Sequence, residues 1–84
     1  MEQRIMSVLD KTVGSQLAKR VNELGLEANL FEYGMDSIGF INVIIGIEIE
    51  FDIFIDQDDL DLDTFSTING IKEYVENRLK EKRI

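Results

Sequence analysis

The sequence predicts an all-α protein in which residues 1–84 form a single domain. Three observations support this: apolar residues recur at helical spacing near the start, a capping signal precedes a periodic segment near the end, and the apolar central segment begins with strong helix caps. A chain of 84 residues fits one compact domain and leaves no length for a second. Domains of this size rarely enclose a deep substrate cavity.

The first helix is predicted from Gln3 to about Ala18. Its apolar residues recur at intervals of three and four, which is typical of an amphipathic helix; they are Ile5, Val8, Leu9, Val13 and Leu17. From Asn22 to Met35 the periodicity is lost and turn-forming residues appear at Gly25, Asn29 and Gly34. We expect a loop there, held to the core by its leucine and phenylalanine side chains.

The central segment allows two interpretations. Residues 47–56 alternate between apolar and acidic side chains, which favours a strand, and Gly39 and Gly46 would each cost a helix about 1 kcal/mol relative to alanine. Against a strand, Asp36 and Ser37 are strong N-caps, and one helical face would collect Phe40, Val43, Ile44, Ile47 and Phe51. A lone strand would also have no partner in this chain. A helix therefore accounts for more residues.

The same helix would present a second apolar arc made of Ile38, Ile41, Ile45 and Ile49. Either the segment 53–63 covers this arc or the arc faces something outside the molecule. Ile38, Ile41 and Ile45 lie nearest Ser37, so we expect these three to make external contacts. Further along, Ser66 or Thr67 can cap a last helix whose buried face is Ile68, Ile71, Val75 and Leu79.

Composition excludes several functions. The chain has no cysteine, histidine, tryptophan or proline, which removes disulfides, thiolate or imidazole metal ligands and the common Cys/His and Ser-His-Asp nucleophilic sites. We therefore expect that the protein is not an enzyme. The net charge of -8 argues against binding to nucleic acid or to anionic membranes. The longest nearly apolar run, Ile38 to Ile47, is far shorter than the roughly 20 residues that span a bilayer. A cytoplasmic protein with no membrane segment is expected.

Charge is segregated along the chain. Twelve acidic residues and no basic residue lie between Val21 and Ile71, which favours a basic partner surface. The densest acidic run, Asp56 to Asp63, raises the alternative of calcium binding. The spacing fails: an EF-hand starting at Asp56 would need glycine at position 61 and glutamate at position 67, where the chain has Asp61 and Thr67. No metal site is expected.

Ser37 is the strongest candidate for a functional side chain. At the first turn of a helix, beside Gly34, Met35 and Asp36, it would lie near free backbone N–H groups and the positive end of the helix dipole, which suits a phosphate. The Asp36–Ser37 pair is equally compatible with a simple helix cap. Because no histidine or cysteine can act as its base, Ser37 would need another enzyme to activate it.

The order of these features resembles the acyl carrier protein family over about residues 5 to 80. The resemblance rests on Leu30, the Gly34-Met35-Asp36-Ser37-Ile38 motif, the helix ending Glu48-Ile49-Glu50-Phe51, then Ile53, Ile55, Asp58-Asp59-Leu60 and Phe65-Ser66-Thr67-Ile68 before Ile71 and Tyr74-Val75. It implies a four-helix bundle of acyl-carrier type. The second helix would start at Ser37, a short third helix would lie near Asp58 to Leu62, and the fourth would run from about Ser66.

The resemblance also implies a function. Ser37 would receive 4'-phosphopantetheine from coenzyme A through a magnesium-dependent phosphopantetheinyl transferase, and Asp36 matches the aspartate associated with magnesium and transferase recognition. The chain would then carry acyl or aminoacyl groups as thioesters between enzymes of fatty acid, polyketide or related biosynthesis. A freestanding monomer is expected, since no Pro- or Ser-rich linker is present.

The expected partner face departs from that of fatty-acid carriers, which commonly show acids in the turn after the attachment serine. Here that turn reads Gly39-Phe40-Ile41-Asn42. We predict partner contacts at Ile38, Ile41, Ile45 and Glu48, made by acyl-loading and acyl-processing enzymes with basic and apolar docking surfaces. The alternative is a small acidic protein–protein interaction module that uses the isoleucine arc and whose Ser37 is never modified.

Overall fold

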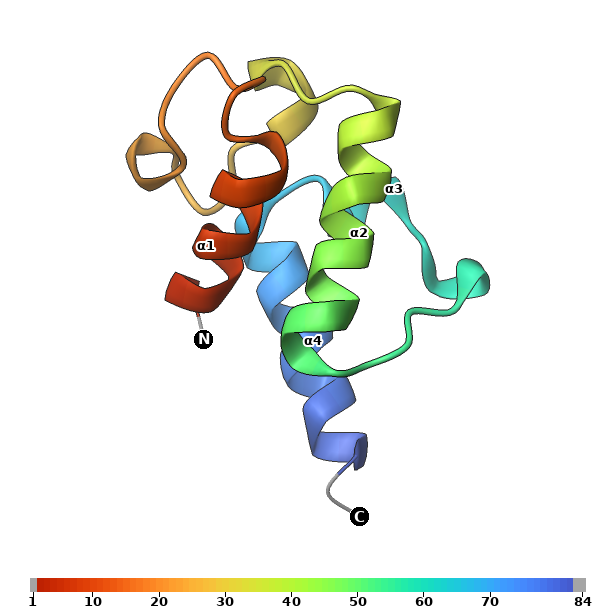
Figure 1. Ribbon diagram of the computed structural model, residues 1–84. Coiled ribbons are helices and arrows are strands. Elements are labelled where there is room, and N and C mark those ends of the chain that lie inside the picture. The colour runs from red at the N-terminus through yellow and green to blue at the C-terminus, as the bar shows by residue number, and fades with distance from the viewer. Residues whose placement is uncertain (1, 83–84) are drawn as a thin grey trace.

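The computed structural model describes residues 2–82, and within that range it contains four α-helices, three short 3-10 helices and no strand (Figure 1). The all-α prediction is therefore confirmed. The α-helices are α1 (Glu2–Val13), α2 (Ser37–Phe51), α3 (Leu62–Phe65) and α4 (Ile68–Lys82), and the 3-10 helices are η1 (Val21–Glu23), η2 (Leu30–Tyr33) and η3 (Gln57–Asp59).

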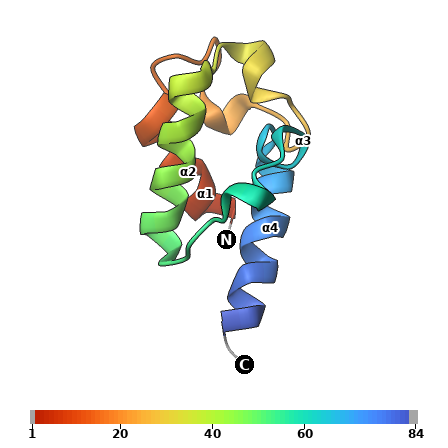
Figure 2. The same cartoon turned by 90° about the vertical axis from the view of Figure 1, so that its right-hand side faces the viewer.

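The most extensive contacts between α-helices are those of α1 with α2 and of α3 with α4, and α1 also contacts α4. Figure 2 shows α2 and α4 on opposite sides of the view, with the 53–61 segment passing between them. Aliphatic and aromatic side chains from all four α-helices fill the core, and the fully buried ones include Ile5, Leu9, Val43, Ile47, Phe65, Ile68, Ile71 and Val75. The molecule is thus a small helical bundle around one core.

Helix α1 ends at Val13, five residues earlier than the spacing predicts. The chain turns at Gly14, and the N–H groups of both Gln16 and Leu17 donate to the Val13 carbonyl at 2.9 and 3.2 Å. Gly14 and Ser15 have low helix propensity, so the helix ends where they begin. Leu17 is nonetheless buried, because the turn carries its side chain back to the core.

The α1–α2 loop is held to the core, as predicted, by buried Leu24 and Leu30 and half-buried Phe31, whereas Leu26 is 37% exposed. Backbone hydrogen bonds also hold it: Ala18 N–H to Tyr33 O at 2.7 Å, Leu30 N–H to Ser66 O at 2.7 Å and Asn69 N–H to Leu26 O at 2.9 Å. In addition, the Asn69 side chain donates to Glu27 Oε1 at 2.7 Å. These bonds attach the loop both to itself and to the start of α4. The loop therefore holds the residues that precede α2 in a fixed position.

The central segment is a helix from Ser37 to Phe51, and the alternative of a strand over residues 47–56 is wrong. The predicted face is buried, with Val43, Ile44, Ile47 and Phe51 all in the core. The helix ends where Asp52 adopts the left-handed conformation at φ 53°, which is unusual for a residue other than glycine. Residues 53–56 continue without regular structure, so the alternation seen in the sequence spans two different local structures.

Gly39 and Gly46 explain why a segment of modest helix propensity packs well. A Cβ atom at Gly39 would stand 2.9 Å from Val13 Cγ1, and one at Gly46 would stand 2.7 Å from Val8 Cγ1. Both glycines therefore face α1 and allow the two helices to approach closely. The far end of this contact is fixed by Arg4, whose guanidinium donates to Glu50 Oε2 at 2.9 Å and to the Glu50 carbonyl at 2.8 Å.

The short third helix lies later than predicted, at Leu62–Phe65 instead of 58–62. Asp61 accepts a hydrogen bond from Asp63 N–H at 3.0 Å and so caps the helix start, while residues 57–59 form η3 instead. The last helix begins at Ile68 and its cap is Thr67, whose Oγ1 accepts from Gly70 N–H at 3.0 Å. Its predicted buried face is confirmed at Ile68, Ile71 and Val75.

Candidate functional site

Ser37 is the first residue of α2, and its side chain is exposed. The helix starts at its upper end in Figure 1. In the described part of the chain, no protein group accepts a hydrogen bond from the Ser37 or Ile38 N–H, and none contacts the Ser37 hydroxyl. These free donors lie at the N-terminus of a 15-residue helix, which is the positive end of its dipole. The position fits a phosphate ester, since it offers donors to an anion without burying it.

Asp36 caps this helix. Its carboxylate Oδ1 accepts from Gly39 N–H at 2.7 Å, and its carbonyl accepts the first helical bond from Phe40 N–H at 2.8 Å. The cap predicted from sequence is therefore present. The remaining carboxylate surface is exposed to solvent, so the same side chain can also face an approaching enzyme.

The residues before Asp36 fix where Ser37 projects. Gly34 has φ 118°, in the left-handed region that glycine tolerates, and a Cβ atom there would lie 2.5 Å from the Gln16 carbonyl oxygen. Met35 follows with only 3% of its surface exposed. A buried anchor on a tightly turned chain thus holds the exposed Asp36–Ser37 pair.

Two residues near this site were not identified from sequence. Gln16 Oε1 lies 2.5 Å from where a Gly39 Cβ would stand, so its amide group covers the first turn of α2. Lys19 Nζ lies 6.0 Å from the centroid of the Tyr33 ring, beside the segment that leads to Ser37. Both belong to the loop after α1, and their proximity arises from tertiary packing that no local pattern indicates.

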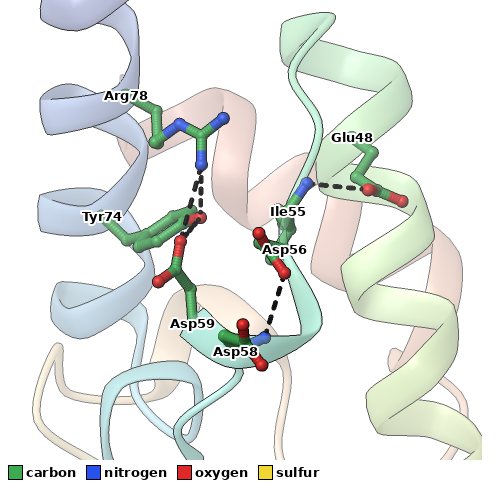
Figure 3. Close-up of polar contacts among 7 residues, drawn as sticks. All are labelled: Glu48, Ile55, Asp56, Asp58, Asp59, Tyr74 and Arg78. Atoms are coloured by element: carbon green, nitrogen blue, oxygen red, sulfur yellow. Dashed lines mark hydrogen bonds and ion pairs between the residues drawn. The ribbon is translucent and has the colours of Figure 1, made fainter.

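The second apolar arc of α2 is exposed. The exposed fractions are 69% for Ile38, 55% for Ile41, 47% for Ile45 and 77% for Ile49. The segment 53–63 therefore leaves these residues open, and we call them the isoleucine face. The segment lies along another side of the helix, where the Glu48 carboxylate accepts from Ile55 N–H at 2.9 Å (Figure 3). Glu48 is half-buried, and the bond from Ile55 N–H gives its carboxylate a partner inside the molecule.

The other end of that segment is attached to α4 by a cluster that we call the Tyr74 cluster, made of Asp59, Tyr74 and Arg78 (Figure 3). Tyr74 OH donates to Asp59 Oδ2 at 3.3 Å, Arg78 Nη1 donates to Tyr74 OH at 3.0 Å, and Arg78 lies 3.6 Å from Asp59 Oδ2. Burial raises the pKa of the Tyr74 phenol, and Asp59 adds to that rise while Arg78 opposes it.

The acidic run itself makes local turns. Asp56 accepts from Asp58 N–H at 3.2 Å and Asp61 accepts from Asp63 N–H at 3.0 Å. Over the described residues, no three carboxylates come close enough together to hold a metal ion. The helices in the same range are all too short or too polar to cross a membrane.

This geometry defines a class of protein. A small helical bundle presents an exposed serine at the start of a long helix, beside backbone N–H groups that can bind an anion. Residues 7–75 match the family model PP-binding, described as the phosphopantetheine attachment site. The chain belongs to this family, whose members carry 4'-phosphopantetheine covalently and generally act as carriers instead of catalysts. Comparisons with curated proteins and with solved structures give no significant match.

Proposed function

We propose that the protein is an acyl carrier whose attachment residue is Ser37. The observation that supports this most directly is the exposed hydroxyl at the N-terminus of α2, inside the range matched by the attachment-site family. The prosthetic group would supply a flexible arm ending in a thiol, which this cysteine-free chain lacks. Acyl or aminoacyl groups would travel on that thiol as thioesters between cytoplasmic enzymes of fatty acid, polyketide or related biosynthesis.

In the loading step, Ser37 Oγ attacks the phosphopantetheine phosphorus of coenzyme A. A new Oγ–P bond forms, the P–O bond to adenosine 3',5'-bisphosphate breaks, and the hydroxyl proton passes to a base on the transferase. The chain's own contribution is to expose the hydroxyl and to stabilise the resulting phosphodiester with the Ser37 and Ile38 N–H groups. Asp36 would face the transferase and its magnesium ion.

We assign the partner face to Ile38, Ile41, Ile45 and Glu48. The three isoleucines are exposed on the same helix as Ser37. Glu48, whose carboxylate also accepts from Ile55 N–H, would add acidity near the far end of the helix. Exposed ion pairs contribute about 0 to 1 kcal/mol each, whereas buried apolar anchors dominate many interfaces. Partners would therefore combine an apolar patch with a basic rim.

The test of attachment is the intact mass of the purified protein before and after incubation with coenzyme A, magnesium and a broad-specificity phosphopantetheinyl transferase. We expect the wild type to gain one phosphopantetheinyl group and Ser37→Ala to gain none. If a known carrier is loaded in parallel while neither variant gains mass, the unmodified interaction module becomes the better interpretation. A gain in Ser37→Ala would place the attachment at another residue.

The partner face is tested with Ile41→Asp and Ile45→Asp. Each change places a charge where we expect an apolar contact, so kcat/KM for transfer to or from a cognate enzyme should fall by about tenfold. Both side chains are about half exposed, so the urea midpoint should change little. Asn42→Asp is the matched control, since it adds the same charge on an exposed position of α2 without removing an apolar group. Unchanged transfer in both isoleucine variants would contradict the assignment.

A further inference from the structure

We propose that the isoleucine face is also the resting site of the acyl group carried at Ser37, so that apolar cargo lies along the outside of α2 instead of inside the bundle. This inference rests on the proposed attachment at Ser37. It adds a ligand-binding surface of defined chemistry, namely one for an unbranched or branched alkyl chain.

Position is the first argument. Ile41 lies one helical turn after Ser37, and the isoleucine face continues through Ile45 to Ile49 near the end of the helix. At 1.5 Å per residue, the distance along the axis from Ile38 to Ile49 is about 16 Å, comparable to an extended medium-length acyl chain. At about 100° per residue, all four isoleucines fall within an arc of about 80° that begins close to the direction of Ser37.

The chemistry of the face is the second argument. All four side chains are aliphatic, and between 47% and 77% of each is exposed. Charged residues of α2 lie outside the arc: Glu48 is turned toward Ile55 and Glu50 toward Arg4. An uncharged alkyl chain would therefore meet mainly aliphatic surface, with Lys11, Thr12 and Glu50 beside Ile49 at the far end. Covering that surface removes apolar area from water on both sides of the contact.

The closed interior is the third argument. The residues around an inward path between α2 and α4 are already packed, with Phe51 at 5%, Ile55 at 4% and Ile68 at 0% exposure. The segment over this path is attached at Ile55 by Glu48 and at Asp59 by the Tyr74 cluster (Figure 3). Entry would displace packed side chains and these hydrogen bonds, whereas the isoleucine face is available without rearrangement.

The tether makes a weak site effective. A flexible arm of this kind holds its end at an effective concentration on the order of millimolar near the surface. Each methylene that becomes fully buried multiplies the bound population by about fourfold, and by less on an open face. Occupancy should therefore rise with chain length. A partner enzyme that covers the same face would displace the acyl group and present it to the partner's own site.

The experiment follows the isoleucine δ1 methyl groups by NMR in the holo protein loaded with acetyl, butanoyl, octanoyl and dodecanoyl groups. We expect shifts at Ile38, Ile41, Ile45 and Ile49 that grow with chain length, while the core methyls of Ile47, Ile68 and Ile71 stay unchanged. The double variant Ile45→Ser/Ile49→Ser should lose most of the shift at Ile41 while its core signals remain. Shifts confined to Ile47, Ile68 and Ile71 would place the cargo inside, and no length-dependent shift at all would equally overturn the inference.

A second arm separates this inference from the proposed attachment. Because the chain contains no cysteine, Ser37→Cys provides a single thiol that an alkyl methanethiosulfonate converts to a mixed disulfide, without any transferase. If enzymatic loading fails, the mass shows it directly, and the octyl and dodecyl disulfides still report whether an apolar chain at position 37 contacts the isoleucine face. Methyl disulfide is the matched control and should leave the four methyl signals in place.

Discussion

At the residue scale, the proposed function gives Asp36 two separable roles. Its carboxylate caps α2 through the 2.7 Å bond from Gly39 N–H, and its exposed surface carries the charge that a transferase would recognise. Asparagine is as good an N-cap as aspartate but is neutral, whereas alanine removes both properties. The two substitutions therefore distinguish folding from recognition at one position.

We expect Asp36→Ala to lower the free energy of unfolding by about 1 kcal/mol, while Asp36→Asn should leave it nearly unchanged. Both variants should be loaded by the transferase more slowly than the wild type, because both lack the charge. Urea unfolding followed by circular dichroism measures the first effect, and the rate of mass gain measures the second. Wild-type loading of Asp36→Asn would show that Asp36 acts as a cap alone.

The predictability of individual residues follows how local their roles are. Asp36 and Thr67 could be identified from sequence because a cap depends on residues within one turn. Gln16 could not, because the 2.5 Å approach of its side chain to the Gly39 position depends on how the loop after α1 folds back. The internal hydrogen bond of Glu48 was missed for the same reason.

At the element scale, the segment 53–61 shows how a region with little regular structure is held in place. Near its start Ile55 is buried and its N–H is bound by Glu48, and near its end the Tyr74 cluster attaches Asp59 to α4. The Tyr74 ring also packs on buried Phe65, with ring centroids 4.9 Å apart. From its place on α4, the Tyr74 side chain thus contacts Asp59 of η3 through its hydroxyl and Phe65 of α3 through its ring.

The Tyr74 phenol should titrate above the ordinary tyrosine pKa of about 10, because burial disfavours the phenolate. A group whose pKa is higher in the folded than in the unfolded state stabilises the folded state at pH values below its unfolded-state pKa. That contribution is lost as the pH rises through its folded-state pKa. We therefore expect the urea midpoint to fall above about pH 10.

Ultraviolet titration in a Tyr33→Phe background isolates the Tyr74 phenol, since the chain has 2 tyrosines. Tyr74→Phe in the wild-type background is the control for the midpoint, and it should lose the part of the alkaline fall that this phenol causes. A titration midpoint at or below the ordinary value would contradict the assigned burial effect.

Element boundaries were less predictable than element types. The helix over residues 37–51 followed from its cap and buried face, although glycine propensity and alternation favoured a strand. The end of α1 was misplaced because Leu17 keeps helical spacing yet reaches the core from a turn. The third helix was misplaced because the family resemblance put it near residues 58–62, whereas the cap at Asp61 and the burial of Phe65 hold it at Leu62–Phe65.

At the scale of the whole molecule, repulsion among acids opposes the compact state. The chain has 17 acidic and 9 basic residues. Its described ion pairs are few and each is at least partly exposed: Arg4–Glu50, Lys72–Glu2 and Arg78–Asp59. Such pairs stabilise weakly, so unpaired acidic surface dominates the balance.

Raising sodium chloride from about 0.01 to about 0.15 M shortens the Debye length from about 30 to about 8 Å, so Tm should rise over this range. Differential scanning calorimetry measures the change. The variant Asp58→Asn/Asp63→Asn, which removes two exposed charges, should show a smaller rise. A Tm that falls with salt would mean that the ion pairs outweigh the repulsion.

The close approach of α1 to Gly39 and Gly46 has a consequence for how this chain can evolve. Val13 and Val8 leave no room for a side chain at these two glycines. On the same helix Ile38 and Ile49 are exposed, so most substitutions there should leave folding unaffected. A saturation library of α2 should thus separate under two selections. Substitutions at the glycines should be depleted when cells are sorted for protein abundance, and substitutions on the isoleucine face should be depleted when growth depends on carrier activity.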